Sequence, residues 1–266
     1  MLDRIAHNGM VLLGCGKMGS AMLAGWLARG VPAASVHVIE PNPSDWLRDT
    51  GVALNTGLPS APAVALVAVK PQMMGDALPA LKALGDGPTL FISIAAGTTI
   101  ARFSDALGAT TPIIRAMPNT PAAVGAGITA LIGNAHVTEE QMALTEALLA
   151  TVGQTVRLED EAQMDAVTGL SGSGPAYVFH MIEAMAEAGV AQGLAPDLAM
   201  TLARATVIGA GQLAAGSEDS AAQLRINVTS PKGTTAAALD VLMPDLTPLM
   251  QRTVKAAADR SRDLSA

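Results

Sequence analysis

The stretch Met10-Val11-Leu12-Leu13-Gly14-Cys15-Gly16-Lys17-Met18-Gly19 decides the fold of the first half of the chain. An apolar strand pattern runs directly into G-x-G-x-x-G, and an apolar helical pattern follows. Gly14 permits a tight turn, Gly16 lets the backbone approach a pyrophosphate, and Gly19 lets the helix pack closely on the strand. The helix N-terminus adds partial positive charge. The segment predicts a dinucleotide-binding loop, and a glycine-rich turn without a ligand is the alternative.

Short apolar runs alternate with helical patterns through the first 160 residues, which is the order of a parallel sheet covered by helices. The first four runs are continuously apolar, so we expect both faces of those strands to be covered. Glu40 ends the second run, about twenty residues beyond the glycine loop, where an acidic side chain accepts hydrogen bonds from an adenosine ribose. The candidate strands are residues 10–14, 36–40, 64–69, 90–94, 113–116, 128–132 and 155–158. The pattern predicts an α/β, Rossmann-type, mostly parallel sheet.

Strand patterns stop after about residue 160, and the rest of the chain has the pattern of helices. The helical pattern at 177–190 has one apolar and one polar face. The next, at 197–213, is apolar almost all round, and such a helix must be buried. We expect it to pack on another subunit, and the centre of a small bundle is the alternative. We therefore predict a dinucleotide-binding domain over residues 1–160 and an all-α substrate-binding and dimerisation domain over residues 161–266.

The composition narrows the class of partner. Proteins that bind nucleic acids or anionic membranes carry clustered Lys and Arg, whereas this chain has a net charge of −7. We therefore expect its partner to be a small ligand, and neither a nucleic acid nor a membrane. Cys15 is the single cysteine, which excludes an internal disulfide and a multi-cysteine metal site, and we predict no metal. The first eight residues lack the pattern of a signal peptide, so we expect a cytoplasmic protein. The apolar stretch 198–215 is interrupted by polar residues and predicts a buried helix.

Residues 168–177, Thr168-Gly169-Leu170-Ser171-Gly172-Ser173-Gly174-Pro175-Ala176-Tyr177, place three glycines and two serines directly before an apolar helical pattern. Pro175 suits the first turn of a helix, where its missing N–H costs nothing. Ser171 or Ser173 can cap the neighbouring free N–H groups. We expect a polar loop with exposed backbone donors, and an ordinary helix start is the alternative.

A partner segment lies at residues 228–235, Val228-Thr229-Ser230-Pro231-Lys232-Gly233-Thr234-Thr235, and a helical pattern follows it. A hydroxyl of Ser230, Thr234 or Thr235 can cap that helix. Gly233 lets backbone N–H groups converge on one point, and such a nest binds an anion. The carboxylate of a small amino acid is the natural guest, because few basic residues are nearby in the sequence.

With these segments the chain resembles the pyrroline-5-carboxylate reductases, which complete proline biosynthesis. The matching segments are the glycine loop and residues 68–72, 93–97, 115–121, 165–177 and 224–235. The resemblance implies hydride transfer from NADPH or NADH to the C=N bond of 1-pyrroline-5-carboxylate, giving L-proline. It also implies a homodimer or a larger assembly of dimers with interlocking helical domains. Two residues depart from the family pattern: Lys17 replaces Asn, and Lys232 replaces Gly.

The resemblance also assigns site residues. The implied cofactor-binding residues are Gly14, Cys15, Gly16, Lys17, Met18, Gly19, Glu40, Asn42, Ala68, Val69, Lys70, Pro71, Ala95, Ala96, Met117, Pro118 and Asn119. The implied substrate-binding residues are Glu218, Ser230, Gly233, Thr234 and Thr235, and the implied catalytic residues are Thr235 and Thr168. We expect Cys15 to fill the loop rather than to perform redox chemistry. We expect His7, His37, His136 and His180 to be structural.

The cofactor and the reaction each have an alternative. Glu40 alone favours NADH because it repels a 2′-phosphate, whereas family members often use NADPH, held by the loop that here contains Asn42 and Ser44. We expect both cofactors to be used, with NADPH preferred. A β-hydroxyacid-dehydrogenase-like enzyme needs a Lys or His acid in the helical domain, where Lys232 and Lys255 are the only lysines and neither is suitably placed. A non-catalytic nucleotide-sensing protein is the other alternative.

Overall fold

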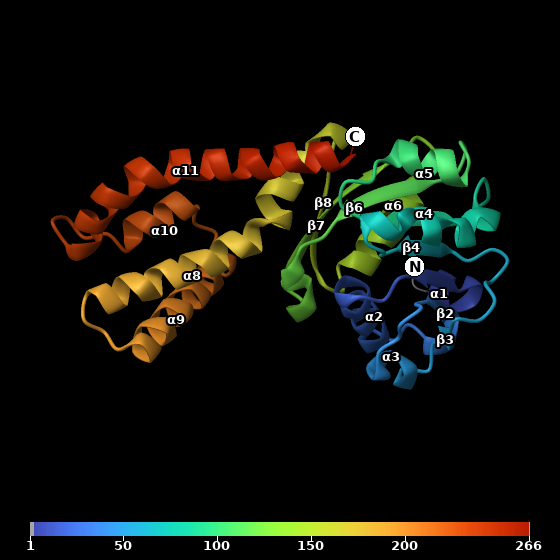
Figure 1. Cartoon of the computed structure of the whole chain (residues 1–266), viewed down its shortest axis with the longest axis horizontal. Coiled ribbons are helices and arrows are strands. Elements are labelled where there is room, and N and C mark those ends of the chain that lie inside the picture. Colours follow the sequence, from blue (N-terminus) through green and yellow to red (C-terminus); the bar gives the residue numbers. More distant parts are fainter. Residues whose placement is uncertain (1–2, 266) are drawn as a thin grey trace. The chain divides into compact units, whose positions relative to one another are not determined.

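The computed structural model describes residues 3–265 and divides them into two compact units. The first unit runs to Gly172 and takes up the chain again at Ala257, and the second holds Ser173–Ala256. The first contains the sheet and the second contains only helices (Figure 1). The predicted α/β sheet domain followed by a helical domain is therefore confirmed as a fold class.

An eight-stranded sheet forms the centre of the first unit, in the order β3-β2-β1-β4-β5-β6-β7-β8. The strands are β1 (Met10–Leu13), β2 (Val36–Ile39), β3 (Ala53–Leu54), β4 (Val64–Val67), β5 (Leu90–Ser93), β6 (Ile113–Met117), β7 (Gly127–Gly133) and β8 (Gly153–Arg157). Neighbouring strands are parallel except β6 and β7, so the mostly parallel sheet is confirmed. All seven predicted strands are present, and the two-residue β3 was not predicted.

The order of the strands creates a switch point beside β1. Met10 of β1 pairs with Val36 of β2 on one side and with Val64 of β4 on the other. The chain therefore first extends the sheet on one side of β1, through β2 and β3, and then on the other side, from β4 onward. Ligands of open α/β sheets bind outside the carboxyl ends of the strands at such a point. The glycine loop follows β1 and lies there.

Two apolar clusters cover the two faces of the sheet. In β1, Met10 and Leu12 belong to one cluster, while Val11 and Leu13 belong to the other. Strands β1, β4 and β5 are buried at every position, which confirms the expected double cover. For β2, the remaining one of these four strands, the expectation of full cover is wrong: burial alternates, because only the two-residue β3 lies beyond it at the sheet edge.

Helices connect the strands of the first unit. They are α1 (Asp3–Asn8), α2 (Lys17–Ala28), α3 (Asp45–Asp49), α4 (Met74–Ala77), α5 (Ile100–Leu107), α6 (Glu139–Leu149) and α7 (Met164–Val167), with short 3-10 turns that include η2 (Pro71–Met73) and η5 (Glu161–Gln163). The hydroxyl of Thr138 caps α6 in a capping box with Gln141. The buried indole N–H of Trp26 in α2 donates to the carbonyl of Leu148 in α6 at 3.0 Å, which ties these two helices together.

The segment 168–177 is helical and is not the open loop that its sequence predicts. After α7 the chain makes a π-helical turn, Thr168–Gly172, and continues into α8 (Gly174–Ala191). The predicted serine caps are wrong. Ser173 itself has helical dihedrals and makes no capping bond, while the Ser171 hydroxyl donates to the carbonyl of Val167 at 3.1 Å. A chain that enters α8 from a preceding helical turn presents few free N–H groups to cap. Pro175 lies in the first turn of α8, as predicted.

The second unit is made of α8, α9 (Pro196–Ala215), α10 (Ala221–Asn227) and most of α11 (Thr234–Ser265). Helices α8 and α9 pack side by side (Figure 1). Their shared core is small and consists of Ala186, Ala199 and Ala203. Many large apolar side chains of these two helices are exposed in the single chain: Val178, Phe179, Met181, Met185, Val190, Leu198, Leu202, Ile208 and Leu213.

Helix α9 has the apolar character that the sequence predicts, but one chain does not bury it. Leu202 is 49% exposed and Ile208 is 52% exposed. Within residues 3–265, α9 alone is long and apolar enough to cross a membrane, judged by length and composition only. A second subunit is the cover that the sequence predicts for this helix.

Candidate active site

The glycine loop has the backbone geometry that its sequence predicts. Gly14 has φ +90°, and a Cβ there would lie 2.8 Å from Cγ1 of Val69. A Cβ at Gly19 would lie 2.6 Å from the carbonyl oxygen of Gly14, so only glycine lets α2 approach the loop this closely. A Cβ at Gly16 would meet nothing within 4 Å, so the backbone there is open to a ligand.

The start of α2 is suited to an anion. Gly16 precedes the helix without a side-chain cap, and the first turn contains no acidic residue. The first N–H groups of a helix have no partner within it, and they carry the positive end of the helix dipole. These two observations fit a bound pyrophosphate at this turn.

The carboxylate of Glu40 binds the backbone of the glycine loop and of the chain after β2. Its carboxylate accepts the backbone N–H of Cys15 at 2.8 Å and that of Asn42 at 3.0 Å. The backbone of Glu40 is itself held by the side chain of Asn55, which accepts its N–H at 2.9 Å and donates to its carbonyl at 2.8 Å. Glu40 is therefore fixed at the carboxyl end of β2, next to the glycine loop.

A cleft of about 580 Å³ lies at this place, along the carboxyl ends of β1, β2 and β4. Of the predicted cofactor residues, it brings together Gly14, Gly16, Glu40, Asn42, Ala68, Val69 and Lys70. Its wall also contains Pro41, which begins the predicted 2′-phosphate loop. Sequence reasoning missed the other lining residues: Leu13, Ile39, Asn55, Met73, Asp76, Ala77 and Ala80. Several of these residues belong to η2, α4 and the turn after α4. Their position in the sequence, shortly after the strand β4, was the signal that could have identified them.

The other predicted cofactor residues do not line this cleft: Cys15, Lys17, Met18, Gly19, Pro71, Ala95, Ala96, Met117, Pro118 and Asn119. Ala95 is buried just beyond β5, and its N–H donates to the hydroxyl of Ser93 at 3.3 Å. Gly97 in the same segment has φ +70°. Ala95 and Ala96 therefore follow a strand end at the same edge of the sheet as the cleft.

Cys15 is half-buried, and its environment suppresses its reactivity. Burial, and to a smaller degree the negative charge of Glu40, raise the pKa of the thiol to about 11. A thiol with this pKa is protonated at neutral pH, and the thiolate is the reactive form.

Two segments that the sequence singles out meet in the first unit. The Asn119 side chain donates to the carbonyl of Ser171 at 3.2 Å and accepts the N–H of Ile128 at 3.0 Å. A Cβ at Gly172 would lie 2.6 Å from Cε of Met117, so this glycine makes room for the methionine. The end of β6 is thus fastened to the π-helical turn. Such turns are frequent at functional sites.

The Ser230–Thr235 segment turns tightly before α11. The carbonyl of Ser230 accepts the N–H of Gly233 at 3.0 Å, and the Ser230 hydroxyl occupies the space where a side chain at Gly233 would lie. Thr234 and Thr235 begin α11. Lys232 has φ +60°, a left-handed conformation that glycine adopts without strain. A lysine in this conformation costs about 1 kcal/mol relative to a glycine.

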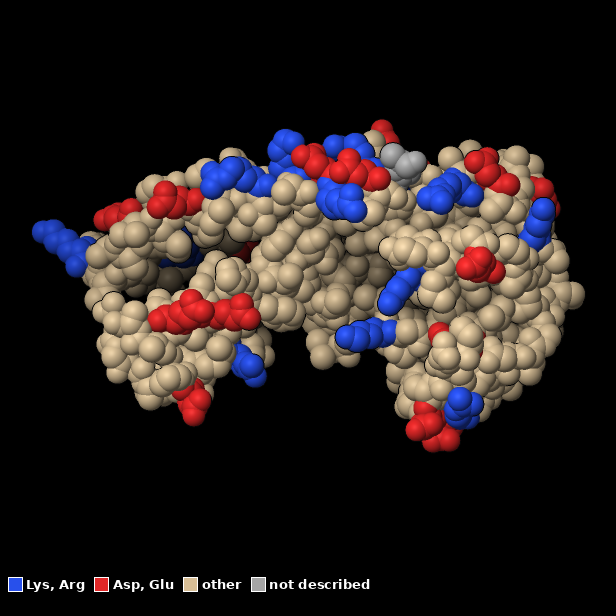
Figure 2. Space-filling view, viewed as in Figure 1, with Lys and Arg blue, Asp and Glu red and all other residues tan. Residues whose placement is uncertain are grey.

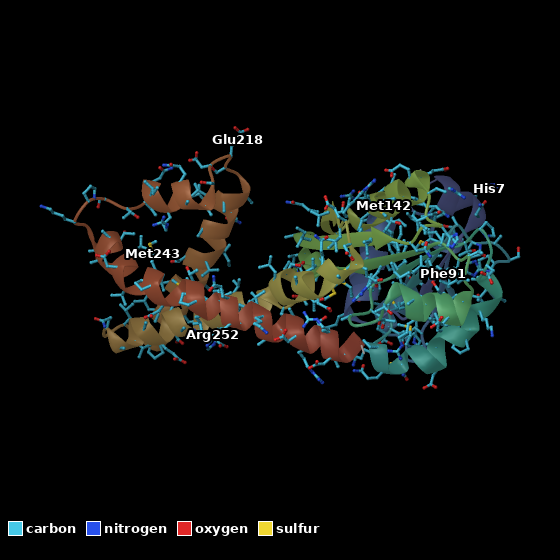
Figure 3. All side chains as sticks on the ribbon, turned by 90° about the horizontal axis from the view of Figure 1, so that it is seen from above. His7, Phe91, Met142, Glu218, Met243 and Arg252 are labelled. Carbon is cyan, nitrogen blue, oxygen red and sulfur yellow. The ribbon has the colours of Figure 1, made fainter. Side chains whose placement is uncertain are left out.

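Two other predicted site residues lie apart from that turn in the sequence. Glu218 is exposed on the connection between α9 and α10, where Figure 3 shows its side chain directed away from the helices. Thr168 is half-buried, and its hydroxyl donates to the carbonyl of Met164 at 2.9 Å. Because its hydrogen is used, the Thr168 oxygen can only accept a further hydrogen bond.

The histidines and acidic groups form no centre of their own in the part of the chain that the structure describes. None of the four histidines lines the cleft, and His180 lies on α8 within 3.1 Å of Glu183. Residues 3–265 contain no group of three or more His, Cys, Asp or Glu side chains placed to hold a metal ion.

Comparison with known proteins identifies the family. Residues 161–264 match the model of pyrroline-5-carboxylate reductase dimerisation, and residues 10–97 match that of NADP oxidoreductases, coenzyme F420-dependent. A curated pyrroline-5-carboxylate reductase of Pseudomonas aeruginosa is 38% identical over 263 residues, covering 96% of this chain and 96% of that protein. This chain belongs to the pyrroline-5-carboxylate reductase family.

Solved structures of the reductase family have the same fold. The pyrroline-5-carboxylate reductase of Coxiella burnetii matches with a TM-score of 0.92 at 34% identity, over 97% of this chain and 99% of that one. The Plasmodium falciparum enzyme, solved with NADP bound, matches with a TM-score of 0.83 at 28% identity, over 98% of this chain and 99% of that one. The resemblance inferred from sequence is therefore confirmed. The β-hydroxyacid-dehydrogenase and nucleotide-sensor alternatives are not favoured.

Proposed function

We propose that this chain is an NAD(P)H-dependent oxidoreductase that reduces the C=N bond of 1-pyrroline-5-carboxylate to give L-proline. The observation that carries the proposal is full-length similarity to reductases of this name, together with a cleft at the switch point of a Rossmann-type sheet. A bound reduced nicotinamide supplies the hydride. The protein supplies position and electrostatics. A protonated imine is a strong hydride acceptor, so the chain needs no histidine–carboxylate acid.

The first part of the chain, residues 1–160, is proposed to bind the dinucleotide. The free N–H groups at the start of α2 and the open backbone at Gly16 fit the pyrophosphate, and Glu40 and Asn42 fit the adenosine ribose. Lys70 and Pro71, just after β4, and Ala95 and Ala96, just after β5, would border the nicotinamide and its ribose. Ala68 and Val69 are proposed as further cofactor contacts at the end of β4. The remaining proposed contacts are Cys15, Lys17, Met18, Met117, Pro118 and Asn119, with Gly14 and Gly19 shaping the loop.

The second part, residues 161–266, is proposed to hold the substrate and to form the dimer. The turn at Ser230 and Gly233 and the first N–H groups of α11 are suited to a carboxylate. The hydroxyls of Thr234 and Thr235 would donate to the substrate. Thr168, whose oxygen remains an acceptor, would receive a hydrogen bond from a protonated ring nitrogen. Glu218 is assigned to the substrate site by resemblance alone.

The chain forms oligomers through its helical domain, and its substrate is a small molecule. We propose a homodimer, or a larger assembly of dimers, that covers the exposed apolar surface of α8 and α9. Neither nucleic acid nor a membrane is a proposed partner. On the face drawn in Figure 2, positive and negative side chains are interspersed, and the net charge is −7. We propose a cytoplasmic enzyme.

The test is a purified full-length chain assayed by nicotinamide absorbance. We expect loss of NADPH and NADH absorbance that depends on 1-pyrroline-5-carboxylate, with one L-proline formed for each cofactor oxidised. A β-keto acid is the control substrate and should give no turnover. Turnover of the keto acid but not of the imine would refute the proposal, as would cofactor binding without any turnover.

A further inference from the structure

Arg115 is a buried cation that pairs with Glu161. It lies on β6 opposite Ser93 of β5, and its side chain is only 5% exposed. Its Nη1 is 2.8 Å from Oε1 of Glu161, whereas its Nη2 is buried without a hydrogen-bond partner among residues 3–265. A buried charge is expensive unless it is paired, so a sheet that retains this arginine depends on Glu161 to neutralise it.

The same carboxylate holds a second element. Oε1 of Glu161 also accepts the backbone N–H of Ile100 at 2.9 Å, and Ile100 is the first residue of α5. Glu161 itself is fixed at the start of η5, where the side chain of Asp160 caps the turn. One oxygen atom therefore joins β6, η5 and the start of α5.

The chain between β5 and α5 is held by these contacts. At its start, the Ser93 hydroxyl accepts the N–H of Ala95 at 3.3 Å. In its middle, Gly97 lies against Leu264 near the end of α11, where a Cβ would be 3.3 Å from the leucine Cβ. At its end, the Ile100 N–H is bound by Glu161. The segment 94–99 is thus fixed at three points, and the last depends on the ion pair with Arg115.

We propose that Arg115 is a positioning residue, which acts through Glu161 to hold the segment 94–99 where the nicotinamide end of the cofactor binds. This rests on the proposed function, which assigns Ala95 and Ala96 to the border of the nicotinamide. Arg115 touches neither the cofactor nor the reacting atoms in this assignment. Its effect is confined to the nicotinamide end, because the adenosine end depends on the glycine loop and Glu40.

The test compares two ligands of the full-length chain. NADPH contains the nicotinamide, whereas 2′-phospho-ADP-ribose contains the same adenosine, pyrophosphate and ribose without it. In Glu161→Ala, we expect the Kd for NADPH to rise about tenfold and the Kd for the fragment to change less than about twofold. Glu161→Gln retains an oxygen for the Ile100 N–H and should fall between Glu161→Ala and wild type. Arg115→Lys retains the charge, so its Kd for NADPH should likewise lie between that of wild type and that of Glu161→Ala.

A matched control breaks another ion pair of the same unit. Glu146→Ala removes a carboxylate 2.7 Å from the exposed Arg157 and should leave both ligand affinities unchanged. Equal loss of affinity for both ligands in the Glu161 variants would overturn the proposal, because it would show a purely structural role. Unchanged NADPH affinity would also overturn it. If Glu161→Ala does not fold, Glu161→Gln and Arg115→Lys decide between these outcomes. A wild-type chain that binds neither ligand would contradict the proposed function itself.

Discussion

Replacing Glu40 by serine should shift the cofactor preference of this chain towards NADPH. The Glu40 carboxylate accepts N–H groups from Cys15 at 2.8 Å and from Asn42 at 3.0 Å, so it occupies two backbone donors that a 2′-phosphate could use. It also places a negative charge where that phosphate would lie. Serine is too short to reach both donors, and it carries no charge. The substitution therefore removes a repulsion and releases donors at the same time.

The size of the shift follows from the charge. Like charges about 4 Å apart repel by roughly 1 kcal/mol in bulk water and roughly 4 kcal/mol near a protein surface, and the solvent that reaches the partly exposed Glu40 favours the lower part of that range. About 1.4 kcal/mol corresponds to a tenfold change. We expect the ratio of kcat/KM for NADPH to that for NADH to rise about tenfold in Glu40→Ser. Loosening of the glycine loop would weaken the binding of NADPH and NADH equally. The ratio of the two kcat/KM values is therefore the quantity to measure.

Two further variants separate charge from loop structure. Glu40→Gln removes the charge but keeps one oxygen acceptor, and should give most of the shift. Asp76→Asn removes a carboxylate from another wall of the same cleft and should change the ratio less than about twofold. An unchanged ratio in both Glu40 variants would show that Glu40 is not beside the ribose. A shift of equal size in Asp76→Asn would show a diffuse charge effect instead.

Three other variants and one alkylation reaction test separate parts of the chain. Thr235→Ala should raise KM for 1-pyrroline-5-carboxylate roughly fivefold, since a lost hydroxyl contact costs about 1 kcal/mol, and should leave cofactor affinity unchanged. An equal loss of cofactor affinity would show that Thr235 belongs to the nucleotide site or stabilises the fold. Gly16→Ala should have the melting temperature of wild type, because its Cβ meets no protein atom, but should bind NADPH about tenfold more weakly. Gly14→Ala should instead lose about 2 kcal/mol of folding free energy, because of its φ of +90° and its contact with Val69. A Gly16→Ala chain with wild-type NADPH affinity would mean that no pyrophosphate passes over Gly16. Iodoacetamide should alkylate Cys15 slowly at pH 8 and faster as the pH approaches its pKa of about 11, because only the thiolate reacts; rapid alkylation at pH 7 would contradict the burial that raises this pKa.

The sheet could be predicted because its strands are apolar on both faces and follow one another in a regular order. β3 could not be predicted, since two half-buried residues, Ala53 and Leu54, carry no periodic signal. The glycine loop was predicted in detail because each glycine has a distinct steric reason. The structure shows the reasons for Gly14 and Gly19, and the approach of a pyrophosphate to Gly16 stays a prediction.

The errors concern places where tertiary context overrides local chemistry. Glycine and serine at 168–173 are typical of a loop, yet the segment continues the helix from α7 as a π-helical turn packed under Met117. The Asp76 side of the cleft was also missed, because the short helix after β4 that lines it contains no recognisable sequence motif. Sequence patterns report backbone preference, and neither of these features is set by backbone preference alone.

In the proposed dimer, the exposed leucine, isoleucine and methionine side chains of α8 and α9 make the stability of this protein depend on its concentration. Within one chain the buried core shared by these helices is only three alanines, so in the proposed dimer most of the apolar burial of these helices comes from association. Dilution should then lower the melting temperature by mass action, in contrast to a protein that folds within one chain. A substitution on α9 that leaves the sheet untouched can in this way inactivate the enzyme at cellular concentration and spare it at the concentration of a crystallisation drop.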